Sequence, residues 1–213
     1  MPTEQALAAA LGDQTRFGQI LIRKSGEGFV LCHRDDESQN DLETFRRADD
    51  AIGIARYDHA GNYRPLKTAP NLRRGWRLEI VDLNELRRAL DYFYPGRLAV
   101  LDAWQKNRLT MTPLRETLDR QSGMYRVAAK ISNEQIDEVV ASVCRSNGGC
   151  LRTILWSRDK SGAVPSTKLP PEKFDPTYDQ TGRGEPAVPL LCQEICSILL
   201  NECREAVKAE ADE

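Results

Sequence analysis

Cys144-Arg-Ser-Asn-Gly-Gly-Cys150 is the first of two short segments around which we expect the chain to be organised. The second, Cys192-Gln-Glu-Ile-Cys196, follows a proline-rich stretch, 157–189, that holds six of the 11 prolines. Four thiols arranged two and two are the donor set of a tetrahedral zinc site or of an iron–sulfur cluster. A long connection without regular structure is unusual inside a compact domain. We therefore interpret 157–189 as a functional loop that folds back so that the four sulfurs converge.

The spacing within the two pairs leaves the identity of the metal open. Zinc ribbons use C-x2-C pairs, and bacterial ferredoxins use a C-x2-C-x2-C run. Neither matches the separation of Cys144 from Cys150 or that of Cys192 from Cys196. Zinc and an iron–sulfur cluster are therefore both retained as hypotheses.

Each pair is expected to lie at a helix end. Cys144 falls in the last turn of a helix, and the Ser-Asn-Gly-Gly after it can turn backbone N–H groups towards sulfur. Cys192 and Cys196, four residues apart, are expected on one face of the first turn of a helix over 190–208. The positive end of that helix would lower the pKa of both thiols. Side chains that could offset cluster charge or shield it from water are Arg145, Arg152, Arg158 and Trp156.

The alternative interpretation of any of the six cysteines is a buried apolar side chain, because free cysteine is among the most buried residue types. Cys32, between Leu31 and His33 on a strand, is interpreted in that way. Cys203 lies on the helical face of Cys196 and is interpreted as a core residue, with a fourth or spare ligand as the alternative. For the four paired cysteines, the spacing favours a metal or cluster.

Composition and charge set the broad class. The 213 residues are 40% hydrophobic and 29% charged, enough for one or two domains with a core. The net charge of −2 gives no general reason to expect nucleic acid or an anionic membrane as partner. No apolar run approaches the roughly 20 residues that span a bilayer, and the N-terminus lacks the features of a secretory signal. We therefore expect a cytoplasmic protein whose reduced cysteines serve metal or redox chemistry.

Basic residues concentrate locally around Trp76, at Lys67, Arg73, Arg74, Arg77, Arg87 and Arg88. A solvated face is the favoured interpretation of this concentration, and a surface for an anionic ligand or nucleic acid is the alternative. The sequence contains no Ser/His/Asp set, P-loop or HExxH motif that would indicate hydrolytic or phosphate chemistry.

The first half of the chain predicts a small, mainly antiparallel sheet. Strand-forming runs at 17–23 and 29–33 flank the turn Ser25-Gly-Glu-Gly28, and Trp76–Val81 alternates as a further strand. A second hairpin is expected from 51–57 to 63–66. Residues 41–47 are expected to form a helical turn or two.

Helices dominate the second half of the predicted fold. Asp82 and Ser132 each begin a capping motif, and Thr112-Pro113 is a helix start with proline at the first position. The pattern predicts an α+β protein. An N-terminal antiparallel sheet with helices forms a domain over 1–110, and a mainly helical, cysteine-liganded domain follows over 111–213.

Three segments together resemble a known family. They are Arg120-Gln-Ser-Gly-Met-Tyr125, Cys150-Leu-Arg-Thr-Ile-Leu-Trp156, and Pro189 with the Cys192-x3-Cys196 pair. This arrangement resembles the C-terminal 4Fe–4S-binding domain, with its preceding stabilising domain, of proteins related to sirohydrochlorin cobaltochelatase. The resemblance implies a [4Fe–4S] cluster held by Cys144, Cys150, Cys192 and Cys196. It also implies a link to sirohaem or cobalamin metabolism.

The chelatase-like domain that comes first in full-length relatives is not recognised in these residues. Metal insertion into a tetrapyrrole needs imidazole or carboxylate groups that receive the metal and accept pyrrole protons. His33 and His59 are the histidines of the chain, and they lie in different predicted hairpins without ligand spacing. We therefore expect an accessory or electron-transfer protein without chelatase activity of its own, working with a separately encoded chelatase. The alternative function is a structural zinc-binding interaction module.

Overall fold

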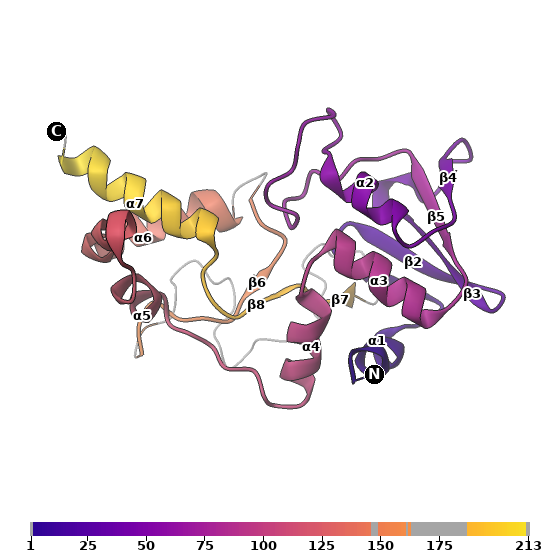
Figure 1. Ribbon diagram of the computed structural model, residues 1–213, viewed down its shortest axis with the longest axis horizontal. Helices are drawn as coiled ribbons and strands as arrows, with labels where there is room; N and C mark the ends of the chain where they lie inside the picture. The colour runs from indigo at the N-terminus through magenta and orange to yellow at the C-terminus, as the bar shows by residue number, and fades with distance from the viewer. Residues whose placement is uncertain (1, 146–148, 161, 163–186, 212–213) are drawn as a thin grey trace. The chain divides into compact units, whose positions relative to one another are not determined.

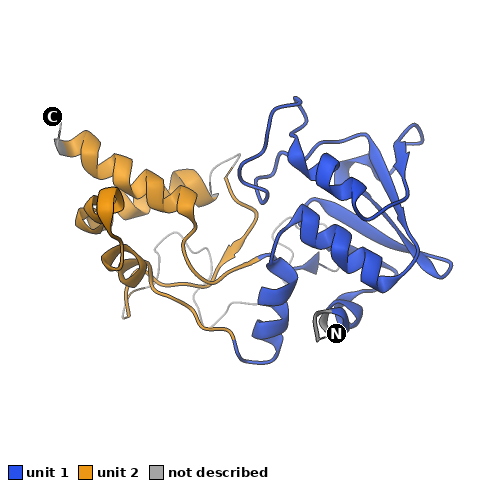
Figure 2. Ribbon diagram, in the orientation of Figure 1, with its two compact units in different colours: residues 1–108, 175–190 blue, residues 109–174, 191–213 orange. Residues whose placement is uncertain are grey.

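The computed structural model of the chain describes residues 2–145, 149–160, 162 and 187–211. These residues fall into two compact units (Figure 2). Unit 1 holds the described residues up to Arg108 together with 187–190, and unit 2 holds those from Leu109 to 162 together with those from Leu191 onward. Most of the predicted loop over 157–189 lies outside the described residues.

Unit 1 contains a six-stranded sheet in the order β4-β5-β3-β2-β1-β7 (Figure 1). The pairs β1–β2, β2–β3 and β3–β5 are antiparallel, whereas β4–β5 and β1–β7 at the two edges are parallel. Sheet and helices together confirm the predicted α+β class, with a mixed sheet where we expected a mainly antiparallel one. The strands are β1 Gln14–Phe17, β2 Ile20–Ser25, β3 Gly28–His33, β4 Glu43–Phe45, β5 Trp76–Ile80 and β7 Ala187–Val188.

The tight turn between β1 and β2 packs against Tyr94. Gly18 has φ +61°, and a Cβ there would lie 2.7 Å from the Tyr94 ring, so glycine is required both for the backbone conformation and for the space. The Tyr94 hydroxyl accepts a hydrogen bond from the Gln19 backbone N–H at 2.8 Å. The Tyr94 ring is fully buried and meets Phe17 edge to face, with 5.3 Å between ring centroids.

The helices of unit 1 are α1 Pro2–Ala10, α2 Asp50–Arg56, α3 Leu83–Phe93 and α4 Arg97–Gln105, and a short 3-10 turn, η1, spans Arg34–Asp36. The predicted start of α3 is confirmed, since the Asp82 side chain accepts a hydrogen bond from the Glu85 N–H at 2.8 Å. Trp76 of β5 stacks on Phe93 of α3 with 5.0 Å between ring centroids. The helices and the sheet therefore share one apolar core.

Two predicted elements in unit 1 are wrong. The expected strand over 51–57 is the helix α2, and only isolated bridges join Tyr57 to Tyr63 and Asp58 to Leu72. Ala51, Ile54 and Ala55 are buried and recur at helical spacing, so packing against α3 selects the helix over the strand that the same residues allow. The expected helical turn at 41–47 contains the strand β4, which pairs with β5.

The segment after α2 is fixed by a buried arginine. Arg64 is 1% exposed, and its guanidinium donates to the carbonyl oxygens of Ala55, Lys67 and Ala69 at 2.7–3.0 Å. Its Nε donates to the Asn71 side chain at 3.0 Å. Burial lowers the pKa of this guanidinium, and the nearby Tyr94 and Asp58 act in the opposite direction. Arg64 thus ties the end of α2 to the loop that follows it.

Unit 2 is mainly helical. The Ser132–Gln135 capping box is confirmed, because the Ser132 N–H donates to the Gln135 side chain at 2.9 Å and the Gln135 N–H donates to the Ser132 hydroxyl at 3.2 Å. The elements are α5 Leu114–Asp119, the 3-10 helix η2 Gly123–Lys130, α6 Asn133–Val140, the π-helical turn η3 Ala141–Arg145, α7 Ser197–Ala211, and the parallel pair β6 Thr153–Ile154 and β8 Leu191–Cys192.

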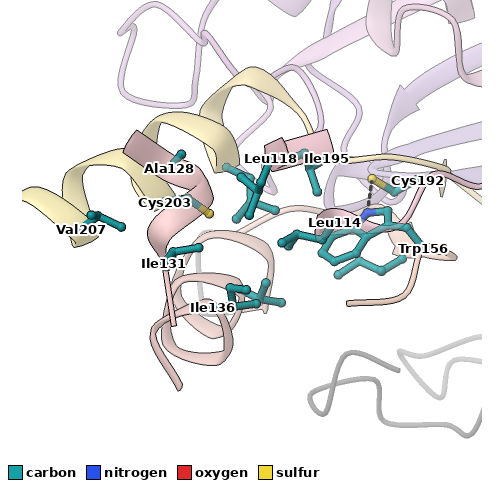
Figure 3. Packing of buried hydrophobic residues seen from close by; sticks show 13 residues of the cluster. Leu114, Leu118, Ala128, Ile131, Ile136, Trp156, Cys192, Ile195, Cys203 and Val207 are labelled. Atoms are coloured by element: carbon teal, nitrogen blue, oxygen red, sulfur yellow. Dashed lines mark hydrogen bonds between the residues drawn. The ribbon is translucent and has the colours of Figure 1, made fainter. Parts of the chain in front are cut away.

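These elements enclose a core of buried apolar side chains (Figure 3). Leu114 and Leu118 of α5, Ile136 of α6, and Leu199 and Val207 of α7 all contribute to it. Within the described part of the chain, none of the helices combines the length and apolar character that crossing a bilayer requires.

His33 is buried in unit 1, and its surroundings predict that the folding stability of the chain depends on pH. Its Nδ1 accepts the Asp35 N–H at 3.1 Å, and its Nε2 lies 3.1 Å from the Gln19 Nε2. Gln19 must present its NH2 group, because its Oε1 accepts the Leu72 N–H at 2.9 Å. Both ring nitrogens therefore face N–H groups. A neutral ring can accept a hydrogen bond at one of them, and a protonated ring can accept at neither, so protonation removes the remaining acceptor. Burial lowers the pKa of His33 to about 4.

Because the pKa of His33 is lower in the folded state, the unfolded chain binds a proton that the folded chain does not between about pH 6.5 and 4. Folding stability should fall as the pH drops through this window, by at most about 3 kcal/mol. The measurement is urea unfolding at pH 7 and pH 4.5. His33→Gln should flatten this part of the profile and His59→Gln should preserve it; equal profiles for wild type and His33→Gln would contradict the prediction.

Candidate metal centre

One cavity in unit 2 brings together the four cysteines that the sequence singled out. The space that their side chains leave free is small, about 10 Å³. Apolar side chains and one arginine complete its wall. The lining residues are Cys144, Cys150, Arg152, Ile154, Trp156, Cys192, Ile195, Cys196 and Leu199.

The first pair spans the end of the α6 segment. Cys144 lies in the π-helical turn η3, and Cys150 begins the extended segment that leads into β6. The Cys150 N–H donates to the Cys144 carbonyl at 3.4 Å, which closes the connection between them. The predicted turn of amides towards sulfur falls on residues 146–148, which lie outside the described part of the chain.

The second pair is positioned differently from our prediction. Cys192 lies in the strand β8, and α7 begins at Ser197, so the two thiols do not share the first turn of a helix. The Leu155 N–H donates to the Cys192 carbonyl at 2.9 Å, so pairing with the β6 segment holds Cys192 extended. Cys196 precedes α7, and its carbonyl accepts the Leu200 N–H at 3.0 Å. A strand and a helix start thus present the two thiols.

Two N–H donors point at cavity sulfurs. The Arg152 Nε donates to the Cys150 Sγ at 3.2 Å, and the indole N–H of Trp156 donates to the Cys192 Sγ at 3.4 Å (Figure 3). Trp156 is 3% exposed, so its ring covers the sulfur on the protein side. Donors of this kind stabilise negative charge on a ligand sulfur and orient it.

Two thiols of this cavity, those of Cys144 and Cys192, are held neutral when no metal is bound. Burial, together with the neighbouring Cys150, Cys192 and Cys196, raises the pKa of Cys144 to about 12. Burial also raises the pKa of Cys192, against the influence of Arg152 and Trp156. This reverses the predicted lowering of the pKa of Cys192, because the residue lies in a buried strand and not in the first turn of a helix. A bound metal would offset the desolvation of the thiolates and their mutual repulsion, and the thiols would release their protons on binding it.

Arg152 is the half-buried cation of the site. Its burial would lower the pKa of the guanidinium, but the surrounding Cys192 and Cys150 sulfurs and the hydrogen bond to Cys150 raise it above its ordinary value. Neither of the other two arginines that we predicted near the cluster, Arg145 and Arg158, is among the residues that line the cavity. Arg158 pairs with Asp137, and the side chain of Arg145 lies outside the described residues.

The donor set fits an iron–sulfur cluster. Four thiols line one cavity, yet no three His, Cys, Asp or Glu side chains among the described residues are placed to hold one metal ion. Around a single zinc ion, Zn–S bonds of about 2.3 Å would draw the sulfurs to roughly 3.8 Å from one another. In a cubane cluster each of four thiolates bonds a different iron, so the four thiols that line this cavity supply a complete set of ligands.

The remaining cysteines are core residues. Cys203 of α7 is 0% exposed within the unit 2 core, and Cys32 of β3 is 7% exposed in unit 1. Neither lines the cysteine cavity. The arginines of the basic concentration form ion pairs with carboxylates: Arg73 with Glu43, Arg74 with Asp35, Arg77 with Glu79, Arg87 with Glu4, and Arg88 with Asp49 and Glu85.

Sequence reasoning did not find the apolar wall of the site. Ile154, Ile195 and Leu199 lie within a few residues of the cysteines, but single aliphatic residues carry no signal that distinguishes a cavity wall from core. Their position follows from the pairing of β6 with β8, which joins segments far apart in the chain.

Comparison with known proteins places the site in a recognised domain. Residues 4–108 match the family of the DR2241 stabilising domain, and residues 106–205 match a family of 4Fe-4S iron-sulfur cluster binding domains. The second match contains all four cavity cysteines. No curated protein matches the chain.

A solved structure resembles nearly the whole chain. It is DR2241 from Deinococcus radiodurans, described as a multi-domain protein with structural similarity to chelatases and two additional novel domains. Sequence identity is 30% and the TM-score is 0.75, over 97% of this chain and 41% of that one. This chain therefore spans about two fifths of the length of its structural relative. The chain thus consists, over 4–205, of a match to the DR2241 stabilising domain followed by a match to a 4Fe-4S iron-sulfur cluster binding domain.

Proposed function

We propose that this chain holds a [4Fe–4S] cluster through Cys144, Cys150, Cys192 and Cys196 and works as an accessory or redox component of tetrapyrrole metabolism. The observation that carries the proposal is the meeting of these four thiols at one cavity, within the residues matched by the 4Fe-4S domain family. When bound, such a cluster supplies a one-electron centre or a brace for the fold.

The residues around the thiols suit a charged cofactor shielded from water. The N–H groups of Arg152 and Trp156 donate to the sulfurs of Cys150 and Cys192, and the guanidinium brings a positive charge. Hydrogen bonds to sulfur, net charge and solvent exposure are the features by which a protein sets the potential of a cluster. We infer that these two side chains hold the ligands in place and favour the reduced state.

An accessory role, rather than metal insertion by this chain, is supported by the chemistry of the cavity. Its described lining contains no histidine and no carboxylate to accept pyrrole protons. The relative is described as similar to chelatases, and this chain spans 41% of it. We therefore propose that the partner is a separately encoded chelatase or an electron-transfer protein.

Anaerobic purification with metal and sulfide analysis tests the cofactor. We expect about four iron and four sulfide per chain, with absorption near 400 nm that bleaches on reduction. One zinc per chain, without iron or sulfide, would instead favour the structural zinc module. A chain that carries neither metal after anaerobic reconstitution would contradict both.

A further inference from the structure

A second cavity, in unit 1, is not used by the proposed function. It has a volume of about 390 Å³ and lies where α2, α3 and the segment after α2 meet. Small-molecule sites typically occupy 300–1,000 Å³, with apolar walls and a few placed polar groups. The walls of this cavity have that composition, since Arg56 and Lys67 stand beside Ile52, Tyr63, Tyr92 and Pro95.

The two cations of this cavity are held without a counter-ion. The Lys67 Nζ donates to the Arg64 carbonyl at 3.0 Å and to the Ala55 carbonyl at 3.4 Å, and it lies 5.0 Å from the centroid of the Tyr63 ring. In the described part of the chain, neither Arg56 nor Lys67 has a carboxylate within ion-pair distance, in contrast to the paired arginines of the same unit. Their charges are therefore available to a ligand.

The local charge is positive. Buried Arg64 lies behind the cavity wall and donates to carbonyl and amide oxygens rather than to a carboxylate. Burial, followed by the charges of Arg64 and Arg56, lowers the pKa of Lys67. Asp91 also lines the cavity, and its side chain accepts the Gly96 N–H at 2.9 Å. Among the lining residues, one carboxylate thus stands against two cations.

The remaining wall suits a flat, apolar body. Tyr63 is 64% exposed and Ile52 is 44% exposed, so large apolar surfaces face solvent beside the two cations. Tyr92 donates its hydroxyl to Asp49 at 3.1 Å, which fixes that ring. Guanidinium and ammonium groups bind carboxylate and phosphate oxygens, and aromatic rings stack on planar ligands.

We propose that this cavity binds a small organic anion, in which a planar apolar body rests on Tyr63 and Ile52 and a carboxylate or phosphate group is held by Arg56 and Lys67. The site is chemically independent of the cysteine cavity, since its residues all belong to unit 1.

The test uses 8-anilinonaphthalene-1-sulfonate, an aromatic anion, titrated into the full chain by calorimetry, because a coloured cofactor would quench its fluorescence. We expect one saturable site per chain. Arg56→Gln and Lys67→Met should each weaken binding about tenfold, the effect of losing one charge-assisted contact. The matched control is Arg46→Gln, which removes an exposed positive charge (79% exposed) that pairs with Glu79 outside the cavity and should leave affinity unchanged.

Two results would overturn the proposal. One is equal affinity for wild type, Arg56→Gln and Lys67→Met, which would place the probe elsewhere. The other is equally tight binding of the cationic aromatic proflavine, which would show apolar contact without selection for an anion. Because Arg56 is exposed, Arg56→Gln keeps the test decisive even if Lys67→Met alters the loop. Competition by benzoate or by inorganic phosphate then distinguishes a carboxylate from a phosphate ligand.

Discussion

Cys192→Ser is expected to abolish stable binding of iron and sulfide. A [4Fe–4S] cluster held by four thiolates has one iron for each, and serine replaces a soft sulfur by a hard, weakly acidic hydroxyl. Cys192 is the ligand with the firmest support, since Trp156 donates to its sulfur and β-pairing fixes its backbone. We expect less than about a tenth of the wild-type iron after anaerobic purification, with the absorption near 400 nm lost.

The serine variant preserves the fold while removing the ligand. The Cys192 thiol donates to the Glu194 carbonyl at 3.2 Å and accepts from Trp156, and a hydroxyl can make both contacts. The metal-free wild type and the metal-free variant should therefore have similar circular dichroism. This comparison separates the loss of a cluster ligand from any loss of side-chain packing.

Cys203→Ala is the matched control for Cys192→Ser. Cys203 is a buried cysteine of the same unit that does not line the cavity. Its loss should cost about 1 kcal/mol of stability and leave the iron content unchanged. Full iron content in Cys192→Ser, or loss of iron in Cys203→Ala, would show that the ligand set is wrong.

The four candidate ligands could be proposed from the sequence because the information is local. Each pair lies within seven residues, and the Ser132 capping box, confirmed in the structure, locates the start of the helical segment that contains Cys144. What the sequence could not supply is the conformation at Cys192. A spacing of four suggests one helical face, but the residue is held extended by β6, nearly forty residues earlier in the chain. Pairing over such a separation leaves no local pattern.

The unit 1 cavity could not be predicted because its residues 51–55 fit both a strand and a helix. Ala51-Ile-Gly-Ile-Ala contains apolar residues at both strand and helix spacing, and burial of Ala51, Ile54 and Ala55 decides for the helix. A strand over 51–57 gives no reason to expect Arg56 and Lys67 to line one cavity. A single arginine such as Arg64 also gives no signal of burial, because arginine is mostly exposed in proteins.

Arg64→Met should destabilise unit 1 by about 3–5 kcal/mol, a large part of the stability of an ordinary domain. The substitution keeps an unbranched side chain in the space but removes every donor. The carbonyls of Lys67 and Ala69 would lose the guanidinium donor, and the Ala55 carbonyl would keep only the Lys67 Nζ at 3.4 Å. Each unsatisfied buried acceptor costs about 1–3 kcal/mol. Urea unfolding, with amide hydrogen exchange to locate the change in unit 1, measures the effect.

Arg56→Met is the control, since Arg56 is an exposed arginine on the last turn of α2 and should cost no more than about 0.5 kcal/mol. Arg64→Lys should recover little, because one ammonium group cannot reach acceptors that surround a planar guanidinium. A loss below about 1 kcal/mol for Arg64→Met would mean that water replaces the guanidinium and that the arginine is not the organising contact. A large loss would show that one buried cation both closes the C-terminal end of α2 and, through the Lys67 backbone, positions the charge that faces the unit 1 cavity.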